Sequence, residues 1–291
     1  MTEQTQKEKV EELKNALPDI QKTRDDRGIG ISRVGIEGVH FPLFVGAKDG
    51  GEVLVYSTIN LYCSLRHQVK GISMSRFEDV LMHWKYKNIN RESLEQFLSE
   101  LRERLGKEDC EDVYAEISFP YFITKTSPMS RAESVMDYKC TFVGRLKEYY
   151  KFHLIVDVLT TSNCPCSREI SENGAHGQRS FATVTVEPLR GTKIWLEDLI
   201  KTIEECGSCE VYPLLKRPDE KYVTEKAYGN AKFVEDVVRD VSLAIQELGT
   251  INKFKIKVVN EESIHPHNAV AYVARKMQGK TWVRDDRGLK G

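Results

Sequence analysis

The feature that most constrains the fold of this chain is a series of segments in which apolar and polar residues alternate. Alternation with a period of two is typical of a β-strand that buries one face and exposes the other. The segment at 139–161 is long enough for two such strands with a turn near 147–150. The other segments lie at 34–45, 53–65, 112–125, 179–188, 253–262 and 268–276. The pattern therefore predicts antiparallel sheets with one face packed against a core.

Between these strands, other segments have apolar residues at helical spacing. They lie at 75–84, 90–106, 195–207 and 231–249. The last three end at a glycine, which commonly terminates a helix. We expect Ser75 to cap the first helix, with Glu78 completing a capping box.

The order of these elements occurs twice along the chain. Each half has two strands, two helices and two strands, and the second half adds an insertion with two cysteines and a helical stretch near 217–228. We therefore predict an α+β protein of two modules whose antiparallel sheets join. The predicted division is an N-terminal tail at 1–30, modules at 31–150 and 151–276, and a C-terminal tail at 277–291. Antiparallel sheets leave edges that need cover, so we also expect an oligomer.

The composition is typical of a soluble globular protein. Of the 291 residues, 40% are hydrophobic and 30% charged, and the formal net charge is −1. No basic field indicates nucleic acid, and no apolar run approaches the roughly 18 residues of a membrane-spanning helix. The first residues lack the apolar core of a signal peptide, and the seven cysteines are an odd number. We therefore expect a cytoplasmic protein with reduced thiols and with neither nucleic-acid nor membrane partners.

Two cysteines, Cys164 and Cys166, lie in the polar stretch "SNCPCSREISENGAHGQRS". The serine and asparagine before them, and Pro165 between them, are typical of the start of a helix, where a thiolate is stabilised. Such a thiol suits a metal ligand or a nucleophile. The alternative is one functional thiol and one buried thiol. His176 follows just before the next strand, and cysteine and histidine are favoured zinc ligands.

Two further histidines, His265 and His267, lie between the last two predicted strands. Residues two apart in an extended chain point to the same side, and Pro266 keeps the residue before it extended. We interpret the pair either as part of a metal site or as two surface histidines. Cys206 and Cys209 have C-x-x-C spacing without a second such pair, so we interpret them as structural thiols.

Acidic and basic residues cluster near the last predicted helix, and we interpret them either as a solvated face or as a site for a ligand with N–H donors and phosphate. Glu235 and Asp236 fall in the first turn of that helix, where the helix N-terminus stabilises a carboxylate. A carboxylate there could accept two N–H donors from guanine or a similar ring. Lys216 and Arg217 could bind phosphate. Neither the Walker A nor the G-x-G-x-x-G pattern occurs in the sequence.

Taken together, these motifs resemble the GTP cyclohydrolase type IB family of the tunnelling-fold superfamily. The matching strings occur in order: "SNCPCSREIS", "AHGQRS", "CEVYPLLKRPDEKYVTEKAY", "FVEDVVRD" and "ESIHPHNA". The strings "KGISMSRF" and "MDYKCTFVG" extend the resemblance over residues 24–276. The family commonly has a histidine where this chain has Ser73.

The resemblance implies a fold, an assembly and a reaction. The fold would be tandem tunnelling-fold modules that assemble into a multi-subunit barrel, a homotetramer with active sites between subunits. The reaction would be hydrolysis of GTP at C8, with release of formate and formation of 7,8-dihydroneopterin triphosphate. This reaction is the first step of pterin and folate biosynthesis.

The resemblance also implies roles for individual residues. One divalent metal per site, which could be zinc, manganese or iron, would be held by Cys164, His176 and Glu220. Glu235 would bind the guanine edge. His265 and His267 would transfer protons, so that they and Cys164 would be the catalytic residues. Candidate cations for the triphosphate are Arg66, Arg76, Arg179, Lys216 and Arg217.

Three alternatives stay open at this point. A nitrile reductase of the same superfold would use Cys164 as nucleophile with NADPH, but its E-S-K-S type string is absent from the sequence. A non-catalytic zinc module would close on Cys164, Cys166, His176 and a later histidine. A cyclohydrolase variant would release a cyclic phosphate product from the same substrate.

Overall fold

All ten strands in the described part of the chain belong to one long antiparallel sheet. The computed structural model describes residues 9, 12, 17–285 and 287. Along the sheet the strands follow the order β1-β2-β3-β4-β5-β6-β8-β9-β10, and the short β7 pairs with β5. Their bounds are β1 (Ile31–Gly46), β2 (Glu52–Leu65), β3 (Val113–Thr126), β4 (Glu133–Leu146), β5 (Tyr150–Asn163), β6 (Gly177–Pro188), β7 (Cys209–Glu210), β8 (Ile251–Glu261), β9 (Ala269–Gln278) and β10 (Thr281–Arg284).

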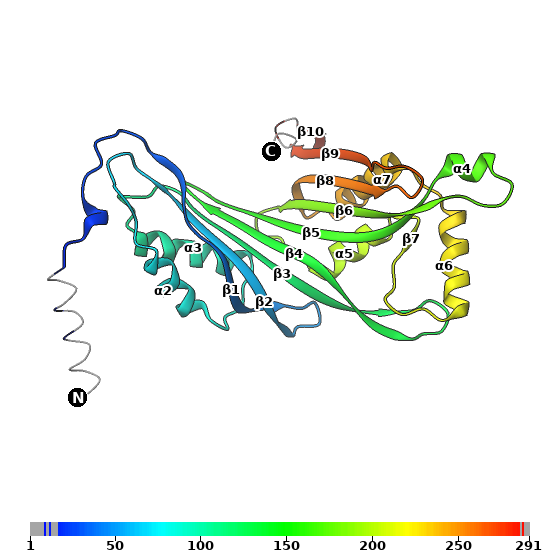
Figure 1. Ribbon diagram of the computed structural model, residues 1–291, viewed down its shortest axis with the longest axis horizontal. Helices are drawn as coiled ribbons and strands as arrows, with labels where there is room; N and C mark the ends of the chain where they lie inside the picture. The colour runs from blue at the N-terminus through cyan, green and yellow to red at the C-terminus, as the bar shows by residue number, and fades with distance from the viewer. Residues whose placement is uncertain (1–8, 10–11, 13–16, 286, 288–291) are drawn as a thin grey trace.

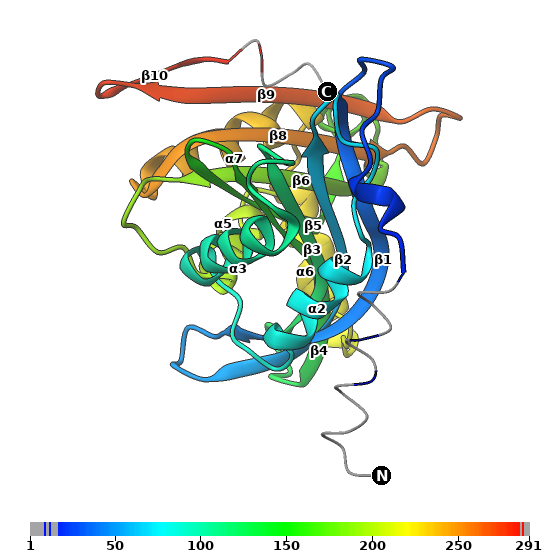
Figure 2. The same ribbon diagram turned by 90° about the vertical axis from the view of Figure 1, so that its left-hand side faces the viewer.

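Two pairs of helices, α2 with α3 and α5 with α7, lie on one side of this sheet, inside its curve, while α4 and α6 lie at one end of the molecule (Figures 1 and 2). The first pair packs against the first half of the sheet and the second pair against the second half. The helices are α2 (Ser75–Trp84), α3 (Arg91–Leu105), α4 (Pro165–Ile170), α5 (Leu196–Glu204), α6 (Arg217–Gly229) and α7 (Val234–Glu247), with a 3-10 turn η1 at Ile20–Lys22. None of the described helices has the length and apolarity needed to cross a membrane.

The alternation seen in the sequence corresponds to the two faces of the sheet. In β2 every second residue from Val55 to Leu65 is buried, and α3 buries the apolar face that was predicted from its spacing. One apolar cluster contains residues from both halves of the chain. The observed α+β class, the antiparallel sheet and the paired helices therefore confirm the predicted fold class.

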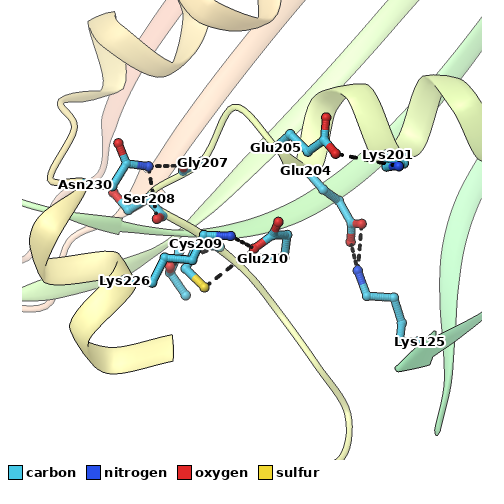
Figure 3. Close-up of polar contacts among 11 residues, drawn as sticks. Lys125, Lys201, Glu204, Glu205, Gly207, Ser208, Cys209, Glu210, Lys226 and Asn230 are labelled. Atoms are coloured by element: carbon cyan, nitrogen blue, oxygen red, sulfur yellow. Dashed lines mark hydrogen bonds and ion pairs between the residues drawn. The ribbon is translucent and has the colours of Figure 1, made fainter. Parts of the chain in front are cut away.

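The two halves share the sheet without a break. The predicted long segment at 139–161 divides into β4 and β5 around a turn at 147–149, and the two strands pair from Cys140–Val156 to Leu146–Tyr150. Further polar contacts join the halves away from the sheet. Figure 3 shows one of them, the ion pair between Lys125 on β3 and Glu204 at the end of α5, with a separation of 2.6 Å.

Three details differ from the sequence-based expectations. The predicted C-terminal tail at 277–291 contains a strand, β10, which pairs with the last four residues of β9. The predicted N-terminal tail contains η1, capped by Asp19, while part of that tail lies outside the described residues. Ser75 is the first residue of α2 rather than its cap, and its hydroxyl lies 2.9 Å from that of Ser73. No side chain caps α2, so the predicted capping box is wrong.

Candidate active site

A cavity of about 290 Å³ opens where the ends of β5, β6 and β8 meet the first turn of α7. Thiol, imidazole, carboxylate and carboxamide groups line it together with a few apolar side chains. The lining residues are Cys164, His176, Gln178, Phe233, Val234, Glu235, Asn260, Glu262, His265, His267 and Ala269. Five residues predicted from separate parts of the sequence, which are Cys164, His176, Glu235, His265 and His267, are therefore gathered at one cavity.

Local backbone bonds bring Cys164 and His176 together. Cys164 is the N-cap of α4, and its Sγ accepts a hydrogen bond from the backbone N–H of Ser167 at 3.5 Å. Pro165 occupies the first helical position, where its missing N–H is not needed. The backbone N–H of Cys164 donates to the carbonyl oxygen of His176 at 3.0 Å. The chain between Cys164 and His176 thus folds back on itself, so that the thiol and the imidazole project from neighbouring backbone segments.

The ring of His176 is oriented by two polar neighbours. Its Nδ1 lies 3.1 Å from Gln178 Oε1 and 4.0 Å from Glu262 Oε2. His176 and Glu262 are 16% and 11% exposed at their side chains, so this contact is largely shielded from water. An acceptor at Nδ1 favours the tautomer whose Nε2 carries a lone pair. That arrangement, with a carboxylate or amide behind the ring, is typical of histidines that bind metals.

His265 and His267 lie on the exposed loop between β8 and β9. Their rings are stacked, with centroids 5.1 Å apart and an interplanar angle of 13°. Both side chains therefore point the same way, as the H-P-H spacing predicted, and both line the cavity. Their exposure leaves them in contact with water at the cavity wall.

The start of α7 presents Glu235 to the same cavity. The neighbouring Asp236 serves the helix itself, because its Oδ2 accepts the N–H of Phe233 at 2.9 Å. Lys232 fixes the helix start against β5, since its N–H donates to Asn163 O and its carbonyl oxygen accepts from Ser162 Oγ. Glu235 lies in the first turn and takes no part in this capping, so its carboxylate is available to a ligand.

Three predicted residues, Lys216, Arg217 and Glu220, are not brought to the cavity within one chain. They lie at the start of α6, next to Asp219, whose carboxylate accepts the N–H groups of Met129 and Ser130 in the β3–β4 turn.

The opposite end of α6 contacts α4, where Arg168 donates to Tyr228 O at 2.9 Å. Glu220 precedes Tyr228 by eight residues, which is about 12 Å along a helix. Correspondingly, the described residues contain no group of three or more His, Cys, Asp or Glu arranged to hold a metal. The expected convergence of Cys164, His176 and Glu220 is therefore incomplete in the single chain.

The other predicted cations also lie outside the cavity lining. Arg179 is an exposed residue of β6, opposite Glu261 on β8. Arg66 forms an ion pair with Glu111 at 3.5 Å. Arg76 donates to Leu105 O and lines a separate cleft of about 520 Å³ in the first half of the chain.

Sequence reasoning missed Gln178, Asn260 and Glu262, which are in the cavity wall. The sequence pattern could have identified Asn260. In β8 every second residue from Ile256 is buried, and Asn260 is a polar residue at such a position, after the apolar Ile256 and Val258. A polar side chain in a buried register of a strand indicates a specific partner. Cys206 and Cys209 are absent from the cavity lining; both are buried and free, as the structural interpretation predicted (Figure 3 shows Cys209).

Comparison with solved structures defines the class of fold. Uricase from Arthrobacter globiformis superposes with a TM-score of 0.51 over 89% of this chain and 96% of that chain, at 10% identity. A uricase from Bacillus fastidious gives 0.50 over 87% and 94%, at 8% identity. The chain therefore has the tunnelling fold, while identities this low say nothing further about its activity.

Comparison of sequences identifies the family. The family model described as type I GTP cyclohydrolase FolE2 matches residues 17–271. The protein called GTP cyclohydrolase FolE2 in Geobacter sp. (strain M21) is 44% identical to this chain, over 91% of this chain and 97% of the relative. The protein of the same name in Nitrosococcus oceani is 43% identical, over 92% of this chain and 98% of the relative. The chain belongs to the FolE2 family of type I GTP cyclohydrolases.

Proposed function

We propose that this protein hydrolyses GTP at C8, releasing formate and forming 7,8-dihydroneopterin triphosphate, as the first step of pterin and folate biosynthesis. The observation that supports this most directly is the cavity that gathers Cys164, His176, His265 and His267 with Glu235. Family membership supports the same reaction, since the relatives are named for it. Each of these side chains has a role that the reaction needs.

Cys164 and His176 are the residues that we propose to hold a divalent metal, either zinc, manganese or iron. Their donor types fit such an ion, and the contacts of His176 Nδ1 with Gln178 and Glu262 leave Nε2 for it. When bound there, the ion would supply a Lewis acid for activating water beside the purine. Glu220 stays a proposed third ligand, and within the described chain it lies away from the other two, so a neighbouring chain would have to supply it.

The stacked histidines are the proposed proton donors and acceptors. Addition of water at C8 places negative charge on the adjacent ring nitrogen, N7. An imidazolium at the cavity wall can neutralise that charge by giving a proton, and its neutral form can later accept one. His265 and His267 are suited to this work because they face the cavity and also contact water, which can return their protons.

Glu235 is the proposed anchor for the base. Guanine presents N1–H and an exocyclic amino group on one edge, and a single carboxylate can accept from both. The first turn of α7 stabilises that negative charge before any ligand arrives. Arg179, Lys216 and Arg217, with Arg66 and Arg76 as further candidates, are proposed to bind the triphosphate.

A homotetramer with active sites between subunits is the proposed assembly. The separation of Lys216, Arg217 and Glu220 from the cavity supports it, because the assembly can place these residues of one chain beside the cavity of another. We also propose that the protein works in the cytoplasm, where its cysteines, all free in the structure, stay reduced.

The experiment that tests the reaction is incubation of the purified protein with GTP and each divalent metal in turn. Formate release and pterin fluorescence after oxidation should appear together and should be abolished by a chelator. Mass spectrometry of the product distinguishes the triphosphate from a cyclic phosphate. Absence of formate with every metal would contradict the proposal, and chelator-resistant oxidation of NADPH by a nitrile substrate would replace it with the reductase alternative.

A further inference from the structure

Near its C-terminal end, β8 has a polar residue at a buried position, whereas the preceding buried positions of the strand hold apolar residues. Ile256 and Val258 are fully buried against the helices, and Asn260, the next residue in the same register, is 1% exposed. Asn260 is nevertheless one of the residues that line the cavity of Cys164 and Glu235. Asn260 is thus a buried amide at the inner wall of the proposed active site.

The hydrogen bonds around Asn260 fix which way its amide points. Its Nδ2 lies 3.2 Å from Ser162 Oγ. The single hydroxyl hydrogen of Ser162 is already donated to Lys232 O, at 2.8 Å. Ser162 therefore accepts from Asn260, which must direct its NH₂ group toward Ser162 and its carbonyl oxygen the other way.

The carbonyl oxygen of Asn260 has no partner among the described residues. Oδ1 is buried and makes no hydrogen bond. Its cross-strand neighbour on β6, Ser180, has a buried hydroxyl that is likewise unbonded, so Ser180 does not satisfy Oδ1. An unsatisfied buried acceptor costs free energy, and that cost is removed when a donor enters the cavity.

Two residues that line the cavity thus carry acceptors with no partner in the described part of the chain, the carboxylate of Glu235 and Oδ1 of Asn260. A ligand that satisfies both needs several N–H donors around one edge of a planar ring. Guanine, a 2-amino-6-oxopurine, has them, because N1–H and one hydrogen of the amino group can go to a carboxylate while the second amino hydrogen is left over. Hypoxanthine lacks the amino group, and xanthine has an oxygen there.

We propose that Asn260 Oδ1 accepts the second hydrogen of the guanine 2-amino group and so determines specificity for guanine over other oxopurines. This inference rests on the proposed function, in which Glu235 accepts the other two donors. Asn260 is a specificity-determining residue in this role, and the hydrogen bond to Ser162 holds its oxygen in place.

The test compares GTP with N2-methyl-GTP, in which a methyl group replaces one amino hydrogen. Dissociation constants are measured by calorimetry on the full-length protein stripped of metal, and kcat/KM on the same protein reloaded with metal. Wild-type protein should bind N2-methyl-GTP about tenfold more weakly than GTP, the expected effect of leaving a buried acceptor unpaired. ITP should show a loss of at least the same size.

Variants separate the oxygen of Asn260 from other causes. Asn260→Leu should bind GTP about tenfold more weakly and should no longer distinguish it from N2-methyl-GTP. Asn260→Asp keeps an acceptor and should keep the discrimination. Asn252→Leu is the matched control on the same strand, since Asn252 bonds to Glu187 away from the cavity, and it should behave as wild type.

The outcomes distinguish this inference from the function on which it rests. Wild-type protein that hydrolyses GTP but binds GTP and N2-methyl-GTP equally overturns the role of Asn260 alone. This comparison does not depend on whether any variant folds. A folded Asn260→Leu protein that still distinguishes GTP from N2-methyl-GTP as strongly as the wild type also overturns the role of Asn260. Protein that neither binds nor hydrolyses GTP overturns the proposed function as well.

Discussion

Cys164 and Cys166 are two residues apart but have different surroundings. Cys164 is half-buried at the start of α4, lines the cavity and accepts the Ser167 N–H, whereas Cys166 is exposed on the first turn of that helix. Each residue of a helix turns the side-chain direction by about 100°, so side chains two residues apart point in nearly opposite directions. Only one of the two thiols can therefore face the cavity. The proposed metal site therefore depends on Cys164.

We predict that Cys164→Ala removes most bound metal and lowers kcat by about 100-fold or more, because a ligand contributes at least as much as the residues that orient it. Metal content is measured by mass spectrometry of the digested protein, and turnover by formate release. Cys166→Ala is the control and should retain both. A Cys164→Ala protein with full metal and full activity would rule out the proposed site.

Some residues of the site could be predicted from sequence and others could not. Short local motifs contain Cys164, His176 and His265, and the chemistry of these motifs can be inferred from the sequence without knowledge of the fold. Asn260 belongs to no such motif, and its importance depends on which hydrogen bonds its neighbours have already made. Glu220 also belongs to a local motif, but its place in the fold depends on Asp219, whose bonds to the β3–β4 turn fix the start of α6, and a sequence motif does not reveal that contact.

At the scale of elements, long and regularly patterned segments were predicted well. The strands with period-two alternation and the helices with one apolar face all form, because burial of that face determines both their type and their orientation. Some short elements were missed. β10 has four residues, too few for a pattern, and it forms because β9 offers an edge and Trp282 packs on Phe254, with ring centroids 5.0 Å apart.

The end of α5 gives a prediction about stability. Glu204 is buried, and its carboxylate binds Lys125 at 2.6 Å (Figure 3). The same carboxylate also accepts a hydrogen bond from Tyr138 OH at 2.6 Å. Glu204→Ala leaves a buried ammonium without a partner, so we predict a loss of about 3–5 kcal/mol in the free energy of unfolding. Denaturant titration followed by circular dichroism measures it.

The control for this prediction is the adjacent residue. Glu205 forms an exposed pair with Lys201 at 3.8 Å, so Glu205→Ala should cost no more than about 0.5 kcal/mol. Equal unfolding midpoints for the Glu204 and Glu205 variants would show that the buried pair does not stabilise the junction between the two halves.

The contact between β7 and α6 predicts a dependence of stability on pH. Burial is the largest single effect and would raise the pKa of Glu210. The hydrogen bond from Lys226 Nζ, at 2.6 Å, outweighs it together with the backbone hydrogen bond, the Lys226 charge and the Cys209 thiol, so the pKa lies below its ordinary value of 4.5. A carboxyl group whose pKa is lower in the folded protein stabilises the fold above its ordinary pKa and loses that contribution as the pH falls through the folded value.

We therefore predict that the unfolding free energy of the wild type falls more steeply below pH 4.5 than that of Glu210→Gln. Denaturant titrations at a series of pH values measure the two slopes. Glu225→Gln, which removes an exposed partner of Lys221 on α6, is the control and should retain the wild-type slope. Parallel curves for the wild type and Glu210→Gln would contradict the assignment.

At the scale of the whole molecule, both ends of the sheet have edges available to another chain. In the described part of the chain, the outer side of β1 is bonded only near its end, where 86–89 pair with Pro42 and Phe44. At the other end, the only strand that pairs with β10 among the described residues is β9, at 275–278. Uncovered edges of this length favour pairing with other strands. We predict by light scattering a particle of four times the 33.4 kDa chain mass. A monomer at assay concentration would contradict the shared active site.

The pairing of β4 with β5 across the middle of the chain has a consequence for dividing the protein. A cut at the turn 147–149 separates the halves without interrupting either strand. Each fragment then has an unpaired strand edge whose partner is the strand of the other fragment. The two edges can rejoin in one register, the one that places Cys140 opposite Val156. Co-expressed fragments should thus reconstitute one another, and each made alone should be insoluble.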